Sequence, residues 1–341
     1  MVYTSLTEAP HNLKEGIDWL VALKGTDAEA NVKGLGAAVY KFLANKPVGF
    51  TEVPALEEVK LISKEFLEQP ELKDMWYVKD MLGKFNEPMD KDNTLYRWFG
   101  ALAESDYENI IKVRGLTADA MVKNVSDVVD GCEKFLENIK APDQYKSAYS
   151  SDATWDASCA EDPKACAVVL VGIAPMLFTG LRSLIDVTGV ANRTTPAFRG
   201  EKNLGKLLKA VGYKEPECRA GMGNSDIRGA FNGVDRYILD KIYDLSGFWA
   251  FYGLNNSESV DAVEPVKPVT TADAVEALKY HTSKNGPHMI AGDNSGVNMG
   301  LLHAWNAKKS NKPPKTGNAL RSNMYYPWLP TVSDLGNVIP I

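Results

Sequence analysis

Apolar residues recur every three or four positions through most of the chain, and this period predicts amphipathic α-helices rather than strands. Asn12 and Glu15 match a capping box, so a first helix is predicted to follow Asn12. Thr26 and Glu29 repeat that pattern ahead of a second apolar stripe. Pro54 suits the first turn of a third helix.

Two later segments carry the longest helical stripes. The first stripe consists of Met121, Val125, Val128, Cys132, Phe135 and Ile139. The second stripe repeats the same rhythm and consists of Ile238, Ile242, Leu245, Trp249 and Tyr252. Alternating β-branched runs joined by Asn-Gly or Asp-Gly hairpin turns are missing before residue 255. The predicted fold class is therefore all-α, a multi-helix bundle stapled by disulfides, with a less regular C-terminal region.

The run 165–181 contains no charged residue, which poses a choice between a membrane span and a buried helix. It lies near the lower length limit for a membrane helix, and Arg182 and Asp186 continue an amphipathic helix directly after it. A bundle needs one member that is apolar on all sides, so this segment is predicted to be the central helix. Pro175 is expected to kink or break that helix.

A domain boundary is predicted at 255–269, where polar residues and two prolines interrupt the helical pattern. Residues 1–254 would form a helical core domain, and a division into two subdomains near 140–152 is left open. Residues 270–341 would form a smaller helical segment followed by an irregular C-terminal tail.

Composition and charge narrow the classes of function. The chain has 341 residues, a formal net charge of -6 and a pI near 5.4, so it lacks the basic footprint of a nucleic-acid-binding protein. The N-terminal segment shows no apolar run typical of a cleavable secretory signal. The C-terminal segment shows no hydrophobic tail and no lipidation motif, so any membrane anchor is expected outside this chain.

Four cysteines, Cys132, Cys159, Cys166 and Cys218, permit two disulfides in three connectivities. Cys159 and Cys166 flank the turn-forming segment 160–163, so a bond between them is sterically reasonable. Cys132 and Cys218 would then form the second pair and close a longer loop. Four buried free thiols are the alternative. The chain has no CxxC motif and no Cys/His ladder, so a structural zinc site is not predicted.

No residue is predicted to be catalytic, to bind a cofactor or to ligate a metal. His281, His288 and the nearby Asp293 match no metal motif with a known mechanism. The segment GDNSG at 292–296 lacks the strand–turn–helix context of a hydrolase nucleophile.

Several segments are long and idiosyncratic strings. The opening SLTEAPHNLKEGIDWLVALKGTD (Ser5 to Asp27) is followed by AVYKFL (38–43), VVDGCEKFL (128–136), ATWDASCAEDPKACAVVLVGIAPML (153–177), EPECRAGM (215–222) and YDLSGFWAFY (243–252). Together they resemble the variant erythrocyte surface antigens and related multigene surface proteins of Babesia parasites. The opening follows the family pattern SLT-x-x-P-x-NLKEAIDW, except that Gly16 replaces an alanine, which weakens the start of a helix slightly.

The resemblance implies a protein at the extracellular face of the infected erythrocyte or at the parasite surface. It implies antigenic variation and adhesion of infected cells to host endothelium, with no enzymatic activity and no cofactor. The partner would be a host cell-surface protein or another member of the same family. All four cysteines lie in the resembling segments, which strengthens the expectation of an extracellular disulfide framework. Two alternatives stay open: a non-adhesive secreted or intracellular scaffold, and an unrecognised enzyme that uses the region 281–303.

Overall fold

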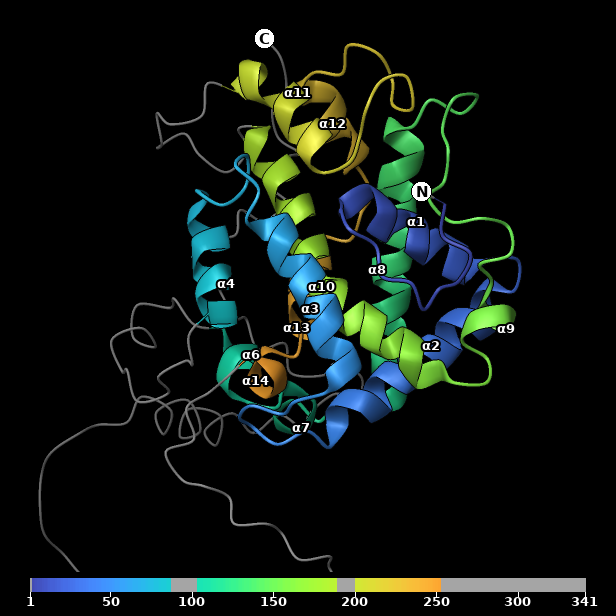
Figure 1. The fold of residues 1–341 in the computed structure, drawn as a ribbon, viewed down its shortest axis with the longest axis vertical. Coiled ribbons are helices and arrows are strands. Elements are labelled where there is room, and N and C mark those ends of the chain that lie inside the picture. The colour runs from blue at the N-terminus through green and yellow to red at the C-terminus, as the bar shows by residue number, and fades with distance from the viewer. Residues whose placement is uncertain (1, 87–102, 189–199, 253–341) are drawn as a thin grey trace, which may run out of the picture. The chain divides into compact units, whose positions relative to one another are not determined.

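The computed structural model describes residues 2–86, 103–188 and 200–252. Within these ranges the chain forms α-helices and two isolated β-bridges but no strand, which confirms the predicted all-α class (Figure 1). The helices are α1 (Leu13–Lys24), α2 (Ala28–Ala44), α3 (Pro54–Leu67), α4 (Trp76–Asn86), α6 (Glu104–Tyr107), α7 (Ile110–Val113), α8 (Ala118–Ile139), α9 (Trp155–Ser158), α10 (Pro163–Val187), α11 (Gly200–Ala210), α12 (Asn224–Ala230), α13 (Ile238–Leu245) and α14 (Phe248–Phe251).

The described residues all belong to one compact unit. A continuous core of buried apolar side chains runs through it, from the N-terminal segment to α14. The predicted linker at 255–269 and the predicted segment 270–341 lie outside the described residues.

The starts of the first three helices test the predicted caps. Asn12 Oδ1 accepts a hydrogen bond from the Glu15 N–H at 3.0 Å, and Asn12 Nδ2 donates to Glu15 Oε1 at 2.7 Å. The cap at Asn12 is therefore confirmed, as is Pro54 in the first turn of α3. The cap at Thr26 is wrong, because α2 begins after Asp27, which makes no side-chain capping bond. Asp27 is also a cap-forming residue type, so the sequence pattern does not decide between the two positions.

The stripe of α8 is confirmed, because every member from Met121 to Ile139 is buried. The second stripe is also buried, but it does not form one continuous helix: α13 ends at Leu245 and α14 begins at Phe248. Gly247 lies between them with a φ of 62°, a left-handed conformation that glycine adopts without steric cost. The spacing of the apolar residues therefore predicted which residues are buried, but it did not predict the turn between α13 and α14.

The centre of the bundle is α10, which contacts α1, α2, α3, α4, α11, α12 and α13 (Figure 1). Its most apolar window of 18 residues is 100% buried inside the protein. Among the described residues it is the one helix that is long and apolar enough to cross a membrane. Its burial against so many neighbours accounts for that composition and confirms the predicted central helix.

The chain continues as a helix through Pro175, so the predicted break at this residue does not occur. Proline has no N–H to donate to the carbonyl of Val171. The next carbonyl, that of Gly172, accepts a hydrogen bond from the buried Ser63 hydroxyl at 2.6 Å. A Cβ atom on Gly172 would lie 2.5 Å from Cγ1 of Val59, so glycine permits α3 and α10 to approach closely here.

Candidate functional site

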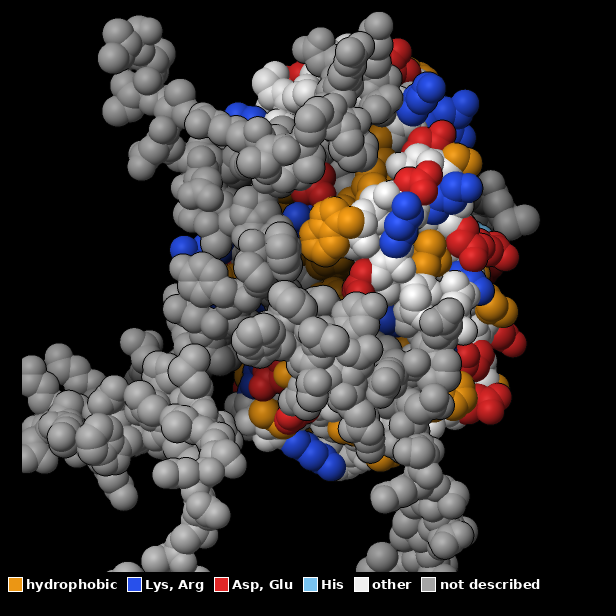
Figure 2. All heavy atoms as spheres, turned by 90° about the vertical axis from the view of Figure 1, so that its left-hand side faces the viewer, with side chains coloured by type: hydrophobic (Ala, Val, Ile, Leu, Met, Phe, Trp, Pro, Cys, Tyr) orange, Lys and Arg blue, Asp and Glu red, His pale blue; other side chains and the backbone are white. Residues whose placement is uncertain are grey.

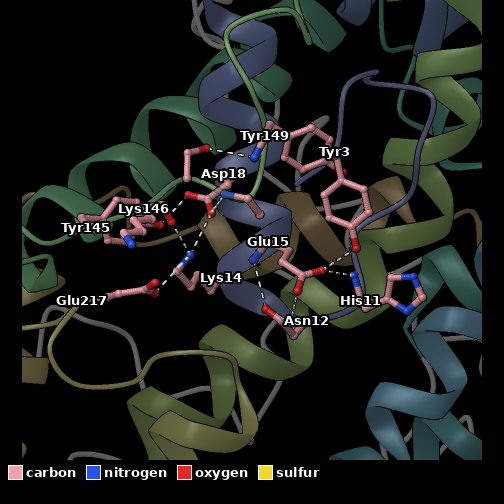
Figure 3. Close-up of polar contacts among 12 residues, drawn as sticks. Tyr3, His11, Asn12, Lys14, Glu15, Asp18, Tyr145, Lys146, Tyr149 and Glu217 are labelled. Atoms are coloured by element: carbon pink, nitrogen blue, oxygen red, sulfur yellow. Dashed lines mark hydrogen bonds and ion pairs between the residues drawn. The ribbon is translucent and has the colours of Figure 1, made fainter. Parts of the chain in front are cut away.

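The N-terminal half of α1 carries a cluster of polar side chains that come from four separate parts of the chain (Figure 3). These parts are the N-terminal segment, α1 itself, the loop that follows α8 and the loop that follows α11. We call the set the α1 polar cluster, and its members are Tyr3, Lys14, Glu15, Asp18, Tyr145, Tyr149 and Glu217.

Asp18 lies at the centre of the α1 polar cluster and is 2% exposed. Its Oδ1 accepts a hydrogen bond from the Tyr145 hydroxyl. Its Oδ2 accepts from the Ala148 N–H at 2.9 Å and from Lys14 Nζ at 3.3 Å (Figure 3). Burial raises the pKa of Asp18, and these donors oppose that rise because they stabilise the carboxylate. Both oxygens are therefore already engaged inside the protein.

Lys14 connects Asp18 to the two loops. Its Nζ donates to the carbonyl of Lys146 at 2.7 Å and lies 3.4 Å from Glu217 Oε2. The same ammonium lies 4.7 Å from the centre of the Tyr145 ring. A buried ammonium needs such a complete set of partners, because an unpaired charge in the interior is strongly destabilising. The contacts hold both loops against α1.

The N-terminal segment is attached by a second set of contacts. The Tyr3 hydroxyl donates to Glu15 Oε2 at 2.8 Å, and the Tyr3 ring stacks on the Tyr149 ring at 4.7 Å between centroids (Figure 3). The Tyr3 N–H donates to the Ala148 carbonyl at 2.8 Å, and the Tyr149 hydroxyl donates to the Glu8 carbonyl at 2.6 Å. Burial raises the pKa of both tyrosines, so they stay neutral hydrogen-bond donors.

These contacts define a structural role for the α1 polar cluster. A general acid or base must exchange a proton with a substrate, whereas Asp18 and Lys14 are buried and bonded to other parts of the chain. The neighbouring Tyr213 hydroxyl is buried and has no hydrogen-bond partner. Burial raises the pKa of Tyr213 well above its ordinary value, which opposes proton donation. Within the described ranges, no group of three or more His, Cys, Asp or Glu residues could hold a metal ion.

The structure joins Cys159 to Cys166, with 5.8 Å between the Cα atoms. The bond connects the residue that follows α9 to the first turn of α10, and both side chains are fully buried. It closes the turn through which the chain enters the central helix. This pair agrees with the expectation drawn from the turn-forming segment 160–163.

The expected bond between Cys132 and Cys218 is not formed, and both residues are buried free thiols. Cys218 lies beside Lys140 in an isolated antiparallel bridge. Cys132 lies about two helical turns earlier on α8, at a rise of roughly 12 Å from Lys140. A disulfide requires Cα atoms within about 7 Å of each other. Burial raises the pKa of the Cys132 thiol to about 12, which suppresses the reactive thiolate.

Of the four histidines of the chain, the structure describes only one. His11 is the one histidine among the described residues, and its backbone N–H donates to Glu15 Oε2 at 2.8 Å. His281, His288 and Asp293 lie outside the described residues, as does the rest of the region 281–303.

The sequence did not reveal the α1 polar cluster. Lys14 and Asp18 are four positions apart, a spacing typical of an ion pair on the solvent-exposed face of a helix. The loop that contains Tyr145 covers this face, and nothing in the local pattern of α1 signals that coverage.

Comparison of this chain with known proteins identifies no relative. No family model, no curated protein and no solved structure matches it. The class that the fold itself defines is an all-α protein with one disulfide among its described residues.

Proposed function

We propose that the chain is the ectodomain of a parasite surface antigen, which acts by binding another protein. The observation that carries the proposal is the buried disulfide between Cys159 and Cys166. Disulfides form and persist in oxidising environments and are rare in cytosolic proteins, where thiols are kept reduced. The bond therefore favours an oxidising compartment, and the family resemblance suggests that this compartment is the extracellular face of the infected erythrocyte or the parasite surface.

The proposed mechanism is protein–protein contact through a surface that a rigid helical frame supports. Buried side chains of the α1 polar cluster bond the N-terminal segment and two loops to the helix. Substitutions at solvent-exposed positions of these segments would therefore leave the buried contacts intact. This separation suits a role in antigenic variation and in adhesion of infected cells. The proposed partner is a host cell-surface protein or another member of the antigen family that the chain resembles.

The charge distribution agrees with a surface that selects protein partners rather than nucleic acid. Basic and acidic side chains are interspersed over the described part of the face drawn in Figure 2. A nucleic-acid-binding face would carry a continuous basic patch instead.

Immunofluorescence on infected erythrocytes tests the proposal. Antibodies raised against the folded chain should label unpermeabilised cells, and an antibody against a cytosolic parasite protein should label only permeabilised cells. A signal confined to the parasite interior would contradict the surface assignment. Adhesion is tested next, by adding the purified chain to endothelial cells and asking whether it competes with infected cells for binding.

A second candidate is a non-adhesive intracellular or secreted scaffold, which the free thiols of Cys132 and Cys218 favour. Peptide mapping of protein purified from parasites, with and without reduction, tests the intracellular form of this candidate. Four free thiols support an intracellular scaffold, whereas a bonded Cys159–Cys166 pair supports the surface antigen or a secreted scaffold, which the immunofluorescence and the adhesion assay then separate.

A further inference from the structure

A row of contacting side chains connects the segment before α3 to the last described residue of the chain. Lys60 Nζ lies 5.4 Å from the centre of the Phe50 ring and 4.7 Å from the centre of the Tyr252 ring. The Tyr252 ring meets the Phe85 ring edge-on, with 4.8 Å between the centroids. We call these four side chains the aromatic row. Phe50 is 54% exposed and Phe85 is partly buried, so both ends of the aromatic row retain surface open to solvent.

The cation of the aromatic row already has its partners. Lys60 Nζ lies 2.8 Å from Glu57 Oε2 and donates to the carbonyl of Phe251 at 2.7 Å. An ammonium that is paired in this way does not require a further anion. The aromatic row therefore suits an occupant that is uncharged and presents apolar or aromatic side chains.

Hydrogen bonds hold the backbone on both sides of Phe50. The Gly49 N–H donates to the Trp249 carbonyl at 2.8 Å. The Thr51 N–H donates to the Ala250 carbonyl at 2.7 Å. The exposed ring is thus carried on a fixed backbone, which lowers the conformational entropy lost when an occupant binds.

The Tyr252 hydroxyl gives the aromatic row a hydrogen-bond donor. It is buried and has no partner. Burial, and secondarily the charge of Glu57, raises the pKa of Tyr252 well above its ordinary value, so the hydroxyl keeps its proton. A buried hydroxyl without an acceptor is destabilising, and an occupant that supplies a carbonyl would remove that cost.

The chain itself contains a segment of matching composition. Residues 325–330 read YYPWLP, which has no charged residue and places Pro327 and Pro330 at the spacing PxxP. Segments with this spacing adopt the polyproline II conformation and dock on aromatic-lined surfaces. Their carbonyls make no internal hydrogen bond, so they are free to accept from a tyrosine hydroxyl. Six such residues span about 16 Å, and the aromatic row is at most about 15 Å long.

The position of Tyr252 brings this segment and the aromatic row together on one chain. Tyr252 belongs to the aromatic row and directly precedes residues 253–341. Docking of 325–330 is then intramolecular, so it costs less translational freedom than the capture of a separate protein.

We infer that the aromatic row binds residues 325–330 of the same chain. The prolines and Trp328 pack on the rings of Phe50 and Phe85, and a carbonyl of the segment accepts a hydrogen bond from the Tyr252 hydroxyl. The inference does not depend on the surface-antigen proposal, because the site and its occupant both belong to this chain.

A second PxxP segment, 265–268, is the rival occupant. Glu264 precedes it and Lys267 lies within it. These charges would lose water on an aromatic surface whose own charges are already paired, so 325–330 is favoured.

Limited chymotrypsin digestion of the full, oxidised chain tests the inference, with cleavage sites identified by mass spectrometry. Cleavage after Trp328 should be slow, and Phe50→Ser should accelerate it at least about tenfold. Cleavage after Trp305, which lies outside the segment, is the internal reference and should not change. The matched control is Tyr237→Ser, at a side chain that is 37% exposed and outside the aromatic row. No acceleration by Phe50→Ser, or equal acceleration by Tyr237→Ser, would overturn the inference.

A peptide assay tests the identity of the occupant. The Pro327→Ala/Pro330→Ala chain should leave the aromatic row open, so it should bind a fluorescein-labelled peptide of residues 322–332 in an anisotropy assay. Adding Phe50→Ser to that chain should weaken binding at least about tenfold, as should alanine at both prolines of the peptide. A peptide of residues 262–272 that competes equally well would assign the aromatic row to the rival segment and overturn the inference.

Dilution and folding controls complete the test. Protection of the Trp328 site that disappears on dilution would mean that a second copy supplies the segment, which contradicts docking within one chain. Circular dichroism should show that the variants fold. Phe50→Leu, which stays apolar but removes the ring, replaces Phe50→Ser if the latter does not fold.

Discussion

At the scale of single residues, the polar side chains that matter most are those whose partners come from distant parts of the chain. Asp18 accepts hydrogen bonds from a helix neighbour and from a loop far along the sequence. Such a carboxylate is stabilising only as long as its donors are all present, because a buried charge without partners costs several kcal/mol. The buried Tyr213 hydroxyl, which lacks a partner, is the opposite case.

The two tyrosines allow a matched test. Tyr145→Phe removes a hydrogen bond to the Asp18 carboxylate and should lower the free energy of unfolding by about 1–3 kcal/mol. Tyr213→Phe removes a hydroxyl that has no partner and should leave stability unchanged or raise it by about 1 kcal/mol. Urea unfolding followed by circular dichroism measures both. Equal destabilisation by the two substitutions would refute the assigned roles.

At the scale of elements, α8 and α10 show two ways in which a helix meets its neighbours. α8 buries one stripe and leaves its opposite face to solvent, so its apolar period is visible in the sequence. α10 is surrounded by other helices and has no polar face over most of its length. Close approach between α10 and α3 then depends on side-chain size, as the missing Cβ of Gly172 shows.

Adding one methyl group tests that approach. Gly172→Ala would bring a Cβ within 2.5 Å of Val59 Cγ1 and should destabilise the protein by about 1–3 kcal/mol through overpacking. Gly83→Ala is the control, because a Cβ there meets nothing within 4 Å in the middle of α4. This control should stabilise the helix by up to about 1 kcal/mol. Thermal unfolding distinguishes them, and a neutral Gly172→Ala would show that α3 can move away.

At the scale of the whole molecule, one covalent bond and one buried polar cluster connect segments that lie far apart in the sequence. The Cys159–Cys166 bond restrains the entry to the central helix, and the α1 polar cluster attaches the N-terminal segment and two loops. The two thiols that remain free lie in the core and take no part in this cross-linking.

Reduction of the disulfide should therefore destabilise the whole protein. The loop between the bonded residues spans a sequence separation of 7, for which chain entropy predicts a loss of about 2–3 kcal/mol. Dithiothreitol should lower the midpoint of urea unfolding in the natural chain and in Cys132→Ala alike. The double variant Cys159→Ala/Cys166→Ala should start less stable and should not respond. A dithiothreitol response that Cys132→Ala abolishes would instead assign the stabilising bond to Cys132.

Local patterns in the sequence determined the helical class, the cap at Asn12, the buried stripe of α8 and the central position of 165–181. Each of these depends on contacts between residues a few positions apart, or on the plain need to bury an uncharged segment. The sequence also predicted the disulfide between Cys159 and Cys166, because the two cysteines are close along the chain and flank a turn.

Only the tertiary structure decided which distant residues meet. It left Cys132 and Cys218 unpaired and buried the pair of Lys14 and Asp18. The physical reason is the same in each case. Burial and pairing of these side chains depend on how loops cross the helices, and the period of apolar residues along one helix carries no information about which loop covers it.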